Sequence, residues 1–115
     1  MLGEPFIPAG QDSGLADAIA ESYGVIGSPV VVCGDVNGSL VLLTTDEVLS
    51  RDAGLVQRFD LRSDGLTVEV DYSVENKSDA NTIIVGDGLH SARIWSPTGP
   101  PCFALAGVLM MYPFE

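Results

Sequence analysis

Apolar and polar residues alternate along one segment of the chain, residues 66–74. Every second residue there is apolar: Leu66, Val68, Val70, Tyr72 and Val74. Successive side chains of a β-strand point to opposite faces of the sheet, so a period of two predicts a strand with one dry face and one wet face.

The preceding segment, residues 55–62, is also strand-like, and Ser63-Asp64-Gly65 separates it from residues 66–74. An Asp-Gly pair favours a two-residue hairpin turn. With that turn three pairs of residues oppose each other: Leu61 with Val68, Phe59 with Val70, and Arg58 with Asp71. The two apolar faces then coincide, which predicts an antiparallel hairpin.

A second hairpin is predicted around Asn37-Gly38, because both residues accept the positive φ of a type I′ turn. Residues 30–33 and 39–45 flank this turn, and a two-residue loop places Cys33 opposite Leu42. Both segments carry apolar residues on both faces. The hairpin is therefore either central to the core or covered by another element.

The last third of the chain predicts two more features. Residues 82–85 and 89–95 flank the glycine-rich turn 86–88, which indicates a third hairpin. Residues 102–112 are apolar on both faces and predict a final long strand, with a bulge or close backbone contact at Gly107.

The N-terminal part differs from the rest. Residues 1–11 contain two of the seven prolines, Pro5 and Pro8, and two glycines, Gly3 and Gly10, around Phe6 and Ile7. This composition favours an extended arm that lies over its own domain or reaches a neighbouring chain. In residues 13–23 the apolar positions recur at helical spacing between a possible cap, Ser13, and Gly24. We expect one short helix there.

Together these segments give about seven strands joined by connections too short for crossover helices, so the strands must be mainly antiparallel. The predicted fold class is mainly β, an antiparallel β-sandwich of jelly-roll type. The 115 residues are the length of one domain. We expect a single domain, 1–115, with an arm over 1–11, a helix over 13–23 and the sandwich over 28–114.

The net charge and the apolar runs of the chain exclude several classes of partner. The chain has 5 basic and 16 acidic residues and a formal charge of −11, which repels nucleic acid and anionic membranes. The longest apolar run, residues 102–114, is shorter than the roughly 20 residues of a membrane-spanning helix. No basic leader precedes an apolar run at the N-terminus, so we expect no signal peptide and synthesis in the cytosol.

Candidate chemistry is sparse. Cys33 and Cys102 lie in apolar runs and are expected to be buried thiols, with a disulfide as the alternative. His90 and Ser91 are adjacent, so on a strand they point to opposite faces and do not form a catalytic pair. Asp35, Asn37 and Ser39 resemble the start of a calcium loop but lack its later ligands and closing glutamate, so they are expected to form a turn, with a weak calcium site as the alternative. We expect no enzyme activity, no metal and no cofactor.

The chain also has more large apolar residues than one strand face requires. These candidate interface residues are Phe6, Ile7, Trp95, Leu109, Met110, Met111, Tyr112 and Phe114. Methionine and aromatic side chains are common in protein interfaces, and packing into the protein's own core is the alternative.

These features resemble the small β-sandwich decoration or cement proteins of tailed-bacteriophage capsids. The residues that carry the resemblance are Pro5-Phe6-Ile7-Pro8, the hairpins and the apolar segment 102–114. The resemblance implies a non-enzymatic structural module of the virion that clamps capsid subunits, acting as a homo-oligomer and binding neither nucleic acid nor membrane. The alternative is a β-sandwich that binds a small molecule or carbohydrate through Trp95.

Overall fold

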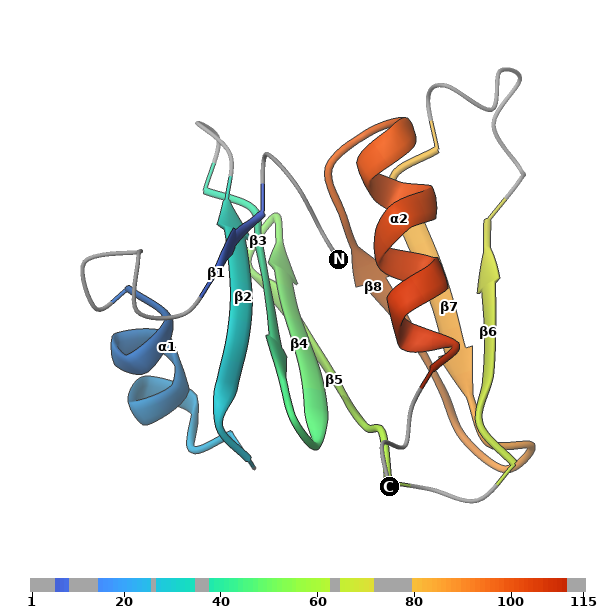
Figure 1. The fold of residues 1–115 in the computed structure, drawn as a ribbon, viewed down its shortest axis with the longest axis horizontal. Coiled ribbons are helices and arrows are strands. Elements are labelled where there is room, and N and C mark those ends of the chain that lie inside the picture. The colour runs from blue at the N-terminus through green and yellow to red at the C-terminus, as the bar shows by residue number, and fades with distance from the viewer. Residues whose placement is uncertain are drawn as a thin grey trace.

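The computed structural model describes residues 6–8, 15–25, 27–34, 38–62, 65–71 and 80–111. These residues form two antiparallel sheets and two helices (Figure 1), so the chain is mainly β. The first sheet contains, in spatial order, β1 (Ile7–Pro8), β2 (Pro29–Gly34), β3 (Leu40–Thr44), β4 (Glu47–Asp52) and β5 (Leu55–Asp60). The second contains β6 (Thr67–Val70), β7 (Thr82–Gly86) and β8 (Ser91–Trp95). The helices are α1 (Leu15–Tyr23) and α2 (Pro100–Leu109).

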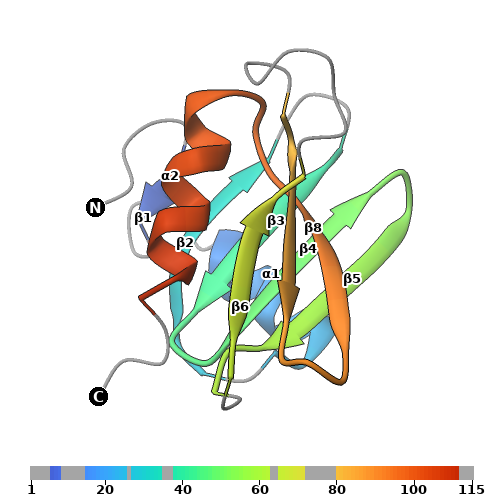
Figure 2. The ribbon, with the colours of Figure 1, turned by 90° about the vertical axis from the view of Figure 1, so that its right-hand side faces the viewer.

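The second sheet is inclined to the first. Figure 1 shows β8 nearest the first sheet and β6 farthest from it, and β8 contacts β3, β4 and β5. Helix α2 packs on β6 and β7 and occupies the wider side of the wedge between the sheets; in Figure 2 it lies beside the second sheet, in front of β1 and β2. Helix α1 covers the opposite face of the first sheet, against β2 and β3.

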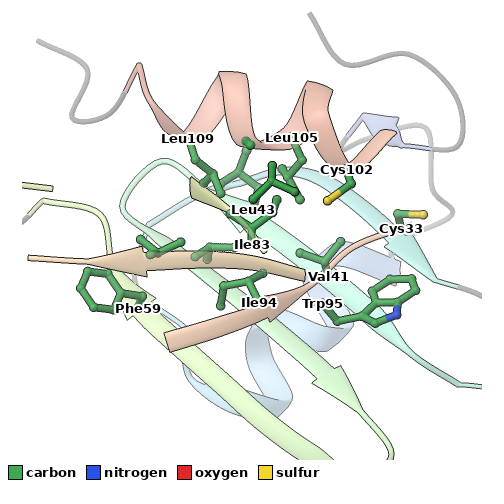
Figure 3. Packing of buried hydrophobic residues seen from close by; sticks show 14 of the residues in the cluster. Cys33, Val41, Leu43, Phe59, Ile83, Ile94, Trp95, Cys102, Leu105 and Leu109 are labelled. Atoms are coloured by element: carbon green, nitrogen blue, oxygen red, sulfur yellow. The ribbon is translucent and has the colours of Figure 1, made fainter. Parts of the chain in front are cut away.

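The main core fills the wedge. Leu105 and Leu109 of α2 point toward Ile83 and Leu43 on the two sheets (Figure 3). A smaller cluster on the other face of the first sheet joins Ile19 of α1 to the buried side chains Val32, Leu40, Leu42 and Leu49. Both faces of β2 and β3 are therefore covered, which explains why these strands are apolar throughout.

The pairing of β2 with β3 confirms the hairpin expected around Asn37-Gly38, but its predicted register is wrong. Cys33 opposes Val41, and Leu42 opposes Val32. The last paired residues are Gly34 and Leu40, so the connection is longer than the two residues of a tight turn. A shift of one residue exchanges the two faces of a strand relative to its neighbour. Because both faces of this hairpin are apolar, the sequence pattern does not distinguish the two registers.

The hairpin expected between residues 55–62 and 66–74 is wrong. Strand β5 pairs with β4, a strand that the pattern did not predict, and β6 pairs with β7. The turn between β4 and β5 is Ala53-Gly54, with φ of 52° and 80°, which leaves Asp52 opposite Leu55. Both φ values are those of a type I′ turn, yet alanine rarely adopts such a conformation.

The final strand expected over residues 102–112 is also wrong, because residues 100–109 form α2. Pro100 and Pro101 occupy the first helical positions, where a missing backbone N–H costs nothing. The buried residues of α2 recur at helical spacing: Cys102, Leu105, Ala106 and Leu109. Since the exposed positions are apolar too, neither a period of two nor of 3.6 stands out.

Two other expectations can be compared with the structure. Helix α1 lies within the range 13–23, although α2 means that it is not the single helix expected. Strands β7 and β8 pair as the third hairpin predicts, with Gly86 opposite Ser91. In each sheet the described strands are adjacent in sequence order, so the Greek-key connections of a jelly roll are not found among them.

Candidate functional site

The predicted interface residues fall into different environments. Phe6, Trp95 and Leu109 are buried in the main core, as the packing alternative expected. Met110 and Met111 are exposed, with 60% and 63% of their surface accessible. The side chain of Ile7 and residues Tyr112 and Phe114 lie outside the described part of the structure.

The two exposed methionines follow the last turn of α2. The Met110 N–H donates to the Ala106 carbonyl at 3.0 Å, and the Met111 N–H donates to the Val108 carbonyl at 3.0 Å. The adjacent Leu109 is fully buried and anchors this end of the helix on the core. The methionine pair therefore projects from a fixed position.

Sequence patterns missed further exposed apolar side chains, among them Leu89 and Leu55. Leu89, in the turn between β7 and β8, is 87% exposed, and Leu55 lies at the tip of the β4–β5 hairpin. The β7–β8 turn and the C-terminal end of α2 lie toward the same end of the molecule (Figures 1 and 2). The unusual exposure of Leu89 is visible only once its neighbours are placed.

A cavity of about 200 Å³ lies where the outer face of the second sheet meets the β4–β5 hairpin. It is lined by Ser50, Asp52, Leu55, Gln57, Thr82, Arg93 and Trp95. Trp95, the residue singled out for ligand binding, is thus in the cavity wall.

One hydrogen bond between the sheets and two polar contacts within them hold this wall in place. The Trp95 backbone N–H donates to Ser50 Oγ at 3.0 Å and so ties β8 to β4. The Ser39 hydroxyl donates to Asp52 Oδ1 at 2.7 Å. Arg93 forms an ion pair with Asp71 across the outer face of the second sheet.

His90 lies beside a second, more open cavity at the other end of the same sheet face. Its backbone N–H, not its imidazole, binds Asp87: the distance to Oδ1 is 2.8 Å, and Leu89 N donates to the same oxygen at 2.9 Å. These two donors lower the pKa of Asp87. Asp87 thus holds the turn and does not orient a histidine base.

Thiols and acidic side chains are the remaining groups that could carry chemistry. Cys33 and Cys102 are buried thiols, as predicted, and burial raises the pKa of Cys102. Asp35 and Asn37 of the candidate calcium loop lie outside the described residues, and the Ser39 hydroxyl donates to Asp52. Among the described residues there is no group of three His, Cys, Asp or Glu side chains arranged to hold a metal ion. Neither described helix is long and apolar enough to cross a membrane.

Comparison with known proteins gives no family. No protein-family model, curated protein or solved structure matches the chain.

Proposed function

We propose that this protein is a structural interaction module that docks onto a larger protein assembly, as a decoration protein docks onto the subunits of a phage capsid. The observation that carries the proposal is the exposure of Met110 and Met111 at the anchored end of α2. Large apolar side chains held at a fixed surface position are typical of docking sites.

Docking is favourable because it buries the methionine side chains without having to order the helix that carries them. Covering a methionine side chain contributes about 1.5–3 kcal/mol when its burial is complete. Because Leu105 and Leu109 already fix α2 on the core, binding does not have to order the helix. Methionine also adapts its shape to the partner surface.

The net charge of the chain indicates what kind of surface the partner presents. The net charge of −11 favours a protein surface that is basic around an apolar socket, and it disfavours an acidic one. Capsid subunits that present such a surface fit this description. A symmetric assembly would be decorated by several copies, so the proposed location is the virion.

We also propose that the two facing sheets constitute a β-sandwich, which leaves one end free for docking.

The test is the mass of the native particle that contains this chain. Particles are purified from the source cells with an antibody to the chain, and their mass and composition are measured by mass photometry and electron microscopy. The proposal expects the chain in a large multi-subunit particle. The double variant Met110→Glu, Met111→Glu should reduce incorporation at least about tenfold, since two buried charges oppose docking.

Leu55→Glu is the matched control, because Leu55 is equally exposed but lies on the β4–β5 hairpin, away from α2. It should be incorporated like the wild type. Recovery of the wild-type chain solely as a monomer, or an unchanged incorporation of the double methionine variant, contradicts the proposal.

A further inference from the structure

The cavity at the β4–β5 hairpin combines an aromatic wall with several kinds of polar group. Trp95 and Leu55 supply apolar surface, while a carboxylate, an amide and two hydroxyls come from Asp52, Gln57, Ser50 and Thr82. Small-molecule sites commonly join apolar walls to a few convergent polar groups. Neither the docking surface nor its methionines take part in this cavity.

The Gln57 amide is available to a ligand. Among the described residues, neither this amide nor the Trp95 indole N–H is hydrogen-bonded to another residue. Gln57 lines the cavity and is half-buried, so its amide can donate hydrogen bonds to a molecule inside and accept them from it. Trp95 is 9% exposed and supplies the accessible part of its side chain to the cavity wall.

The charges around the cavity select against an anion. Arg93, the basic residue in the wall, is already paired with Asp71, and the Asp52 carboxylate adds negative charge. The net charge of −11 acts in the same direction. A phosphate or carboxylate ligand would therefore be repelled, whereas a neutral ligand would not.

The volume of the cavity limits the size of the ligand. A volume of 200 Å³ corresponds to about six or seven water molecules of about 30 Å³ each, enough for one sugar ring. A pyranose has hydroxyls that both donate and accept, together with an apolar C–H face that packs on an aromatic ring. We propose that this cavity binds a neutral saccharide, with the ring against Trp95 and its hydroxyls bonded to Gln57 and Asp52.

Trp95 is the single tryptophan of the chain, so its fluorescence reports on this cavity. The full chain is titrated with the methyl glycosides of glucose, galactose, mannose and N-acetylglucosamine, and with choline as an organic cation. At least one glycoside should give a saturable change with a Kd on the order of 1 mM, the strength expected of a ligand with about a dozen non-hydrogen atoms.

Gln57→Ala should weaken that binding at least tenfold, while Thr67→Ala should leave it unchanged. Thr67 lies on the same sheet face but lines the other cavity. Urea unfolding of each variant establishes that it is folded. The proposal is overturned by a response to choline alone, by no saturable response to any of the glycosides, or by glycoside binding that Gln57→Ala does not change.

Discussion

Arg58 binds the buried carboxylate of Glu47 through two contacts, 2.5 Å from Nε to Oε1 and 3.1 Å from Nη2 to Oε2. The same guanidinium donates from Nη1 to the Tyr23 carbonyl at 2.9 Å, at the C-terminal end of α1. A cation is favourable at that end of a helix. Hydrogen bonding to Glu47 raises the pKa of Arg58, so this residue stays charged. One side chain thus joins β4, β5 and α1.

We predict that Arg58→Met destabilises the fold by about 1–3 kcal/mol, because Glu47 loses its bidentate partner while remaining buried. Urea unfolding measures the change. Arg62→Met is the control, since its ion pair with Asp60 joins side chains that are 52% and 43% exposed, and surface pairs contribute little. Equal losses in the two variants would contradict a special role for Arg58.

We predict that Gly107→Ala stabilises the protein by about 0.5–1 kcal/mol, because glycine is unfavourable in a helix. Gly107 lies in α2, and a Cβ added there meets no atom within 4 Å. Gly86→Ala is the contrasting variant and should destabilise, since its Cβ would lie 3.1 Å from the His90 carbonyl oxygen. Thermal or urea unfolding distinguishes the two. Destabilisation by Gly107→Ala would be evidence for a strand or bulge at this position.

We predict that Ala53→Asn stabilises the β4–β5 hairpin by about 0.5 kcal/mol. Ala53 has a φ of 52° in the two-residue turn, where Asn is better tolerated than alanine. Ala53→Val should have the opposite effect, because β-branching makes a positive φ more costly. Unfolding midpoints of the three proteins should fall in the order Asn, Ala, Val; any other order argues against this turn.

Acid should destabilise the fold. The Arg62 side chain lowers the pKa of Asp60, and the N–H groups of His90 and Leu89 lower that of Asp87. A folded-state pKa below the unfolded value of about 3.9 means that the ionised carboxylate stabilises above that pH, and that this stabilisation is lost as the pH falls through the folded pKa. Asp87→Asn retains the acceptor oxygen without the charge. Between about pH 4 and pH 2 the free energy of unfolding should therefore fall less steeply with decreasing pH for this variant than for the wild type, as measured by urea unfolding at each pH.

Both cysteines should react slowly with a thiol reagent. Burial excludes the reagent from Cys33 and Cys102, and the raised pKa of Cys102 reduces its thiolate fraction. Ellman's reagent should modify the folded protein at least about 100-fold more slowly than the protein in urea. Rapid modification without denaturant would place a thiol at the surface.

Local signals were sufficient where both partners of an element lie close in sequence. The β7–β8 hairpin follows from the turn between its strands, and the mainly antiparallel class follows from short connections. For β6 the same reasoning chose β5, the nearer strand, and was wrong, because β6 pairs with β7. For β5 it missed the adjacent strand β4, whose polar residues Ser50, Arg51 and Asp52 concealed a strand. The pattern shows which residues prefer a strand but not which strand lies beside them.

The sequence by itself determined that this chain is acidic, mainly β and provided with buried thiols, because composition and residue spacing act locally. Only the tertiary structure decided that residues 100–109 form a helix, since their apolar surface fits either period until the wedge between the sheets selects one face. It also decided that Trp95 lines a cavity while Met110 and Met111 stay exposed. Burial depends on neighbours that are distant in the chain, and no local pattern encodes them.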